Sequence, residues 1–226
     1  MNRLESELQR LYRLPSTAAP GDVRALVLEL GRPADWEALS RVWRGVQADL
    51  ALPAPAIAVS GSDGLQLWFS LQAPVNAARG AEFLAGLRAR YLADIAPARL
   101  RLTPPAAELP PVPAEQPATG NWSAFVAPDL AAVFVDTPWL DIPPGAEGQA
   151  DLLARLESIR PAAFDAAMQG LQPGDAAAAM PPATLAPASG DTPDVDPRRF
   201  LQRVLNDETV TLALRIEAAK ALLARS

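Results

Sequence analysis

The sequence contains no cysteine and no histidine among its 226 residues. Structural zinc, histidine-ligated haem and iron–sulfur clusters depend on those side chains, so the sequence excludes such sites. Catalysis by Ser-His-Asp or Cys-His arrangements is excluded for the same reason. Carboxylates are the metal ligands that remain, and they suit only hard cations such as magnesium, manganese or calcium.

The sequence also lacks a long apolar run. No stretch of about 18 apolar residues occurs, which excludes a membrane-spanning helix, and we expect no contact with a membrane. The N-terminal residues 1–14 are charged and amphipathic, and no apolar stretch follows them, so we expect no secretory signal. The absence of cysteine leaves the redox compartment open, and we expect a cytoplasmic protein.

Basic residues are scarce in the middle of the chain. Residues 1–103 carry a net charge of +2, residues 104–196 carry −11, and residues 197–226 carry +3. An acidic middle segment would repel nucleic acid from its own surface. It could instead cover a basic face of the same chain or of a partner protein.

Apolar periodicity predicts an α+β core at residues 21–103, preceded by an N-terminal helix within residues 1–20. Alternating residues predict strands near 24–30, 56–60, 65–71 and 99–103. Helical spacing predicts one helix that starts after Asp35 and another over about 77–95. The order β-α-β-β-α-β is that of a ferredoxin-like (split βαβ, RRM-like) sheet, with helices on one face and the other face left open.

The second half of the chain is less regular. We expect a Pro-rich linker at 104–120 and a small α/β extension at 121–170 that packs on the core, with short strands at 122–126 and 131–136 and a helix at 147–159. Residues 171–196 have almost nothing to bury, which predicts a disordered tether. Residues 197–226 form a predicted helical hairpin, which either packs on its own core or engages a partner.

Residues on the open side of the predicted sheet suggest a binding face. Strands 1, 3 and 4 are neighbours in this arrangement, so Glu29, Gln66 with Trp68, and Arg99 with Arg101 share that face. Arginines bind phosphate and an indole stacks on a base, so the group suits a nucleotide. The alternative is that residues 104–160 cover the face and that Trp68 belongs to the core, because an exposed tryptophan is uncommon.

Two runs in this region carry a family resemblance. LVLELGRPADW at residues 26–36 is followed by a helix and then by IAVSGSDGLQL at residues 57–67. Their order and spacing resemble the archaeo-eukaryotic primase-polymerase superfamily, above all the polymerase domain of bacterial DNA ligase D. That family has an Asp-x-Asp strand, a helix and a Ser-Gly-x-x-Gly-x-His hairpin, and the resemblance covers about residues 24–103.

The resemblance implies that the reactive positions are lost. Glu29 falls on the first metal-binding Asp and could still hold a metal, whereas Gly31 falls on the second and cannot. Gln66 replaces the His that contacts the incoming nucleotide. Asp136 is the one candidate for a third carboxylate. Two-metal phosphoryl transfer needs several converging carboxylates, so we expect a catalytically inactive relative. A residual enzyme that uses Glu29 and Asp136 with magnesium or manganese is the remaining enzymatic alternative.

The sequence therefore predicts a non-catalytic, primase-polymerase-like module that binds a nucleotide, nucleic acid or a replication or mobile-element partner. The alternative is an interaction or scaffold protein that acts through residues 197–226 and the acidic middle segment. The tail weakly resembles phage small-terminase-like proteins, which favours a bacterial phage or mobile-element origin. The predicted binding-face residues are Glu29, Ser60, Gly61, Gly64, Gln66, Trp68, Arg99 and Arg101.

Overall fold

The computed structural model describes residues 2–103 and 111–172, which all belong to the first of the two units into which the chain divides, Met1–Ala179 and Met180–Ser226. The predicted helical hairpin at 197–226 lies outside the described residues. So do almost all of the predicted tether and the first part of the Pro-rich linker.

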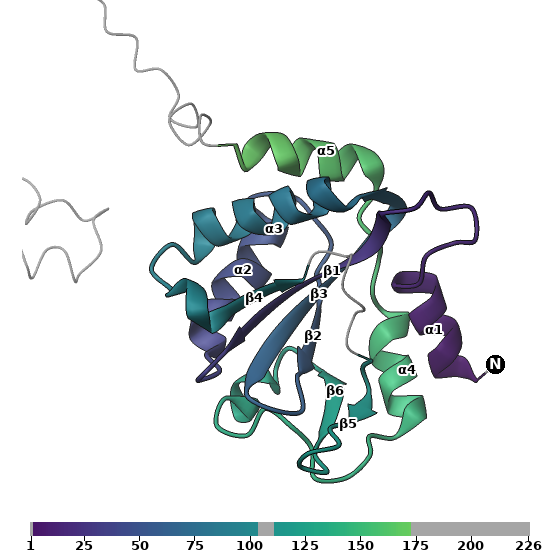
Figure 1. The fold of residues 1–226 in the computed structure, drawn as a ribbon, viewed down its shortest axis with the longest axis vertical. Coiled ribbons are helices and arrows are strands. Elements are labelled where there is room, and N and C mark those ends of the chain that lie inside the picture. Colours follow the sequence, from purple (N-terminus) through teal and green to yellow (C-terminus); the bar gives the residue numbers. More distant parts are fainter. Residues whose placement is uncertain (1, 104–110, 173–226) are drawn as a thin grey trace, which may run out of the picture. The chain divides into compact units, whose positions relative to one another are not determined.

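One antiparallel sheet of six strands organises the described residues, in the order β4-β1-β3-β2-β6-β5 (Figure 1). The strands are β1 (Asp22–Gly31), β2 (Ala56–Val59), β3 (Gly64–Asn76), β4 (Leu100–Thr103), β5 (Ala114–Glu115) and β6 (Trp122–Val126). Since β6 pairs with β2, the predicted extension continues the sheet of the core. The α+β class expected from the sequence is confirmed.

Helices cover both faces of this sheet. The described residues contain five α-helices: α1 (Arg3–Leu11), α2 (Trp36–Ala48), α3 (Ala77–Tyr91), α4 (Ala146–Ala154) and α5 (Pro161–Gly170). Helices α2, α3 and α5 pack on one face, called the first face below. Helices α1 and α4 pack on the opposite, second face (Figure 1). The prediction of helices on one face only is wrong, because the second face carries Val27, Trp68 and Phe125, whose apolar surface is buried by α1 and α4.

The first face contains the larger core, and local sequence explains its formation. The side chains of Leu26, Leu28 and Leu30 alternate along β1 and pack beneath α2 and α3, as expected from the pattern. Helix α2 begins where predicted, because the side chain of Asp35 accepts a hydrogen bond from the backbone N–H of Ala38 at 2.9 Å.

The structure departs from the expected elements in the second half of the chain. Residues Ala131–Phe134 form a short 3-10 helix, η2, where we expected a strand; Ala131 is fully buried while Val133 is exposed, and these residues join no strand ladder. Helix α4 ends at Ala154, earlier than predicted. The following residues pass to the first face, where Ile159 bridges Leu71, and α5 then packs there. A second 3-10 helix, η1 (Pro97–Arg99), precedes β4.

Candidate functional site

The sheet register brings three of the predicted site residues into one row on the second face. Glu29 on β1 lies opposite Gln66 on β3 and opposite Arg101 on β4. Trp68 lies two residues further along β3, beside Val27. Strands β1, β3 and β4 therefore position these side chains as neighbours.

A chain of hydrogen bonds joins three of these side chains. The indole Nε1 of Trp68 donates to Oε1 of Gln66 at 2.8 Å, and Nε2 of Gln66 donates to Oε2 of Glu29 at 2.8 Å. An indole N–H can only donate and a carboxylate can only accept, so this orientation of the amide is the one that satisfies both neighbours. Gln66 and Trp68 are 2 % and 4 % exposed, and Glu29 is 9 % exposed. The indole N–H of Trp68 and the amide of Gln66, which a bound nucleotide would have to contact, therefore already form their hydrogen bonds within the protein.

Aromatic rings enclose Trp68. The ring of Tyr12 meets it edge-on at a centroid distance of 5.3 Å, and Phe125 does so at 5.7 Å. Tyr12 and Phe125 stack on each other at 6.0 Å. The prediction that Trp68 lies on an open face and stacks on a base is therefore wrong. The alternative that the face is covered applies, although the cover comes from α1 as well as from α4 in the range 104–160.

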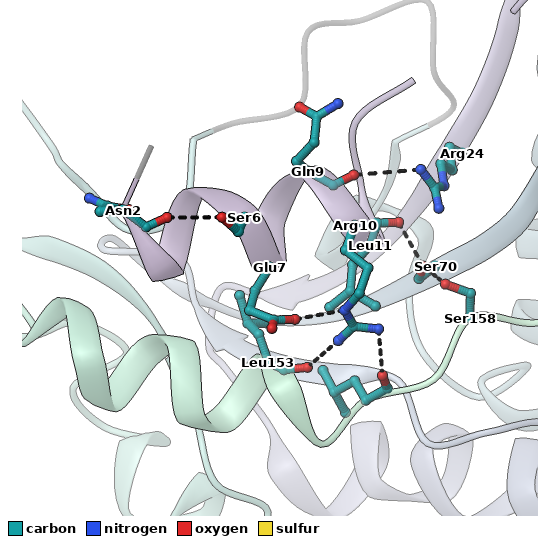
Figure 2. A network of polar contacts seen from close by, with 11 residues as sticks. Asn2, Ser6, Glu7, Gln9, Arg10, Leu11, Arg24, Ser70, Leu153 and Ser158 are labelled. Atoms are coloured by element: carbon teal, nitrogen blue, oxygen red, sulfur yellow. Dashed lines mark hydrogen bonds and ion pairs between the residues drawn. The ribbon is translucent and has the colours of Figure 1, made fainter. Parts of the chain in front are cut away.

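Polar bonds hold α1 over this face (Figure 2). The guanidinium of Arg10 donates to the carbonyl oxygens of Leu153 and Leu156 at 2.9 and 3.1 Å, at the C-terminal end of α4. A cation suits a helix C-terminus, where unpaired carbonyls concentrate negative charge. The hydroxyl of Ser70 on β3 donates to the carbonyl oxygen of Leu11 at 2.6 Å and lies 2.6 Å from the hydroxyl of Ser158. Helix α1 is thus bonded both to α4 and to the sheet.

The Ser60–Gly64 hairpin is also closed. The hydroxyl oxygen of Ser60 accepts hydrogen bonds from the backbone N–H groups of Ser62 and Gly64 at 3.1 and 3.0 Å. Gly61 has φ +81°, and a Cβ atom there would lie 2.8 Å from Cγ of Gln116. The backbone oxygen of Ser60 accepts a bond from the same Gln116 side chain. These residues shape the turn and its packing.

The two arginines of the predicted binding face differ in environment. Arg99 donates to the backbone oxygens of Pro33 at 2.7 Å and Gly31 at 3.4 Å, so it stabilises the turn between β1 and α2. Arg101 is exposed, and none of the ion pairs formed among the described residues involves it. Arg101 is therefore the residue of this face that presents an accessible charge.

The described carboxylates do not form a metal cluster. Across residues 2–103 and 111–172, no three histidine, cysteine, aspartate or glutamate side chains gather closely enough to hold a metal ion. The strand that we expected to carry Asp136 toward Glu29 does not form. Asp136 instead lies exposed in the loop after η2.

Sequence reasoning missed the contribution of Tyr12 to this region. Its hydroxyl is buried and has no hydrogen-bond partner among the described residues. Burial raises the pKa of this phenol well above its usual range, which keeps the group protonated. The apolar stripe of Leu4, Leu8 and Leu11 indicates that α1 has a buried side, and Tyr12 follows at the same spacing, but the stripe does not reveal that the ring meets Trp68.

No protein-family model matches the chain, and no curated protein matches it. Within the part of the chain that the structure describes, no helix combines the length and apolar character needed to cross a lipid bilayer.

Proposed function

We propose that this chain is a non-catalytic, primase-polymerase-like module, built on a ferredoxin-like core of β1, α2, β2, β3, α3 and β4, that binds a nucleotide or nucleic acid. Two observations support a core of this kind. Strands β1 and β3 pair as neighbours, and β4 pairs with the free side of β1. The hairpin between β2 and β3 also occupies the position that the motif resemblance implies.

The hydrogen-bond chain of Glu29, Gln66 and Trp68 carries the proposal that catalysis is lost. In the resembling family this face supplies metal ligands and a histidine for the nucleotide. Here one carboxylate remains, and one of its oxygens accepts a bond from a buried amide. Two metal ions need several carboxylates to hold them. A single carboxylate, with one oxygen already hydrogen-bonded to Gln66, cannot hold the two metal ions that phosphoryl transfer of this kind needs.

Arg101 is the residue at which we place ligand binding. Its guanidinium lies on β4, at the edge of the sheet, and is accessible. Guanidinium groups bind phosphate oxygens in a bidentate manner. Binding through phosphate replaces the base stacking that the sequence suggested for Trp68, and it predicts weak dependence on base identity.

Fluorescence anisotropy with a labelled single-stranded oligonucleotide, competed by unlabelled nucleoside triphosphates, tests this proposal. Arg101→Gln should weaken binding and lower its salt dependence by about one phosphate contact. Arg160→Gln removes the same charge from an exposed residue before α5, on the opposite face, and serves as the control. Equal affinity of the wild-type and Arg101→Gln proteins would refute the binding mode. Manganese-dependent nucleotide incorporation that Glu29→Gln abolishes would refute the loss of catalysis.

A second candidate function is that of an interaction protein. The sequence has no lysine or arginine between Arg101 and Arg155, whereas this stretch contains seven acidic residues. Within it, the side chains of Leu130, Val133 and Ile142 are 49 %, 69 % and 72 % exposed. Residues three apart in a 3-10 helix lie on one side, so Leu130 and Val133 are neighbours. An apolar pair in acidic surroundings suits a basic amphipathic helix of a partner.

A synthetic amphipathic helix of alternating leucine and lysine blocks is a suitable probe for this second function. We expect the double change Leu130→Ser and Val133→Ser to weaken its binding without altering the fold, because both side chains are exposed. Leu14→Ser removes an exposed apolar side chain next to Arg13 and should have no effect. Identical affinities of all three proteins would exclude this surface as the contact.

A further inference from the structure

Strand β4 forms one edge of the six-stranded sheet (Figure 1). It pairs with β1 on its inner side, and no described strand pairs with its outer side. In an antiparallel ladder, successive residues direct their backbone N–H and C=O groups to opposite sides of the strand. Half of the backbone groups of β4 therefore point away from the sheet, where an added strand can bond them.

The other end of the sheet is closed to such an addition at β6. The two-residue strand β5 pairs with β6 at Trp122 and Ser123. Further along β6, the side-chain amide of Gln149 accepts a hydrogen bond from the backbone N–H of Phe125 at 2.8 Å and donates one to its carbonyl oxygen at 2.9 Å. A buried amide thus takes the place of a neighbouring strand there. Strand β4 has no such cover among the described residues.

The side chains of β4 define what an added strand should carry. Leu100 and Leu102 are half-buried and pack against the core of the first face. Arg101 lies between them on the second face, where it is exposed and forms no ion pair with a described residue. Residues that lie opposite each other on neighbouring strands share a face and interact. A strand that complements β4 therefore has a carboxylate between two apolar residues.

Strand β1 already presents this pattern to the inner side of β4. It carries the run Leu-Glu-Leu at residues 28–30, in which Glu29 lies opposite Arg101. The Glu29 carboxylate accepts a hydrogen bond from Gln66, and no ion pair joins it to Arg101. The charge of Arg101 is therefore available to a carboxylate on the outer side. A second copy of the chain would instead bring a second Arg101 to this edge, where like charges repel.

We propose that β4 binds an extended peptide segment of a partner protein, in which one acidic residue stands between two apolar residues. The segment adds a strand to the sheet beside β4. Its backbone bonds supply most of the affinity, and its alternate side chains supply the specificity. The inference does not rest on nucleotide binding, because the backbone of β4 makes the bonds and Arg101 only selects the acidic residue.

Fluorescence anisotropy of the full-length protein with a labelled, end-blocked peptide Thr-Leu-Glu-Leu-Thr tests the selection of charge. Replacing the glutamate of the peptide by lysine should weaken binding by about fivefold, because a like charge then lies opposite Arg101. Arg101→Gln should bring the two affinities together. Arg160→Gln, at an exposed residue just before α5, should keep them apart. A difference between the peptides that persists in Arg101→Gln would overturn the proposal.

Alternate N-methylation of the peptide tests the addition of a strand. A peptide at a strand edge bonds its neighbour through every second residue, so methyl groups on one set of backbone nitrogens remove those bonds and methyl groups on the other set face solvent. One peptide is methylated at both leucines, the other at the glutamate and the second threonine. One pattern should abolish binding, and the other should change the affinity by less than about twofold.

Equal effects of the two methylation patterns would overturn the proposal, because a bond pattern without alternation is not that of a strand. Failure of the unmodified acidic peptide to bind would overturn it as well. Dimers of the protein that tighten in Arg101→Gln would then assign the edge to a second copy of the chain. The oligonucleotide experiment has no counterpart to the methylated peptides, so the two proposals fail independently.

Discussion

The indole Nε1 of Trp68 and the amide oxygen of Gln66 lie 2.8 Å apart on the same strand, and the amide nitrogen of Gln66 reaches the carboxylate of Glu29 at the same distance. Gln66 therefore satisfies two neighbours at once. It links the carboxylate of Glu29 to the aromatic cluster of Tyr12, Trp68 and Phe125.

Gln66→Met should destabilise the protein by about 2–4 kcal/mol. Methionine fits the space, but it leaves the buried indole N–H and one carboxylate oxygen without partners, and each such loss costs about 1–3 kcal/mol. Urea unfolding followed by circular dichroism measures the change. Gln72→Met, at an exposed position on the same strand, is the control and should change stability by less than about 0.5 kcal/mol. A small effect at both positions would mean that the hydrogen-bond chain adds little.

Tyr12→Phe should leave the stability of the ligand-free protein unchanged or raise it by up to about 1 kcal/mol. The substitution removes a buried hydroxyl that has no partner among the described residues and keeps the packed ring. Thermal unfolding provides the measurement. A loss of more than about 1 kcal/mol would reveal a hydrogen bond to this hydroxyl.

The protein should lose stability in alkaline solution between pH 10 and about 12. Burial, with a hydrogen bond to Asp49, raises the pKa of Tyr91 from 10.0 to about 12. The folded state therefore holds the phenol proton more tightly than the unfolded state, so its contribution is complete below pH 10 and disappears as the pH rises toward 12. Denaturant unfolding at several pH values measures the slope. Tyr91→Phe should make the slope shallower, and an unchanged slope would contradict the assignment.

Gly61→Ala should destabilise the hairpin, whereas Gly145→Ala should not. Gly61 has φ +81°, and an added Cβ would lie 2.8 Å from the Gln116 side chain and 2.9 Å from the backbone nitrogen of Ser123. We expect a cost of about 1–3 kcal/mol. No atom lies within 4 Å of a Cβ at Gly145, and its φ is −64°. Comparison of the two unfolding curves gives the result, and equal stability would show that the Gly61 turn relaxes without cost.

Much of the first face could be predicted from sequence because its signals are local. The alternating leucines of β1 and the Asp35 cap of α2 depend on neighbours within a few residues. The expected strand order also predicted that Glu29, Gln66 and Arg101 share one face, whereas their register opposite one another comes from the structure. Each of these features needs only the pattern along one segment or one assumption of topology.

The cover of the second face by α1 and α4 could not be predicted from sequence. An apolar stripe indicates that a helix is packed on one side, but it does not identify the surface that the helix packs against. Leu4 and Leu8 are compatible with any apolar surface, and alternation leaves Trp68 equally suited to solvent or to a cover. The strand expected at 131–136 failed for a related reason. The apolar alternation at 131–136 is short, and no strand of the sheet lies beside it to form a ladder. These residues instead form a 3-10 helix that buries Ala131.

The double attachment of Ser70 has a consequence for synthesis of the chain on the ribosome. The hydroxyl of Ser70 contacts Leu11, near the beginning, and Ser158, near the end of the described residues. While the first hundred residues emerge, neither α4 nor Ser158 yet exists, so α1 has no partner helix and the indole of Trp68 is only partly shielded. The nascent chain therefore exposes the apolar second face of its sheet until residue 158 has left the exit tunnel. We expect it to depend on chaperones at that stage.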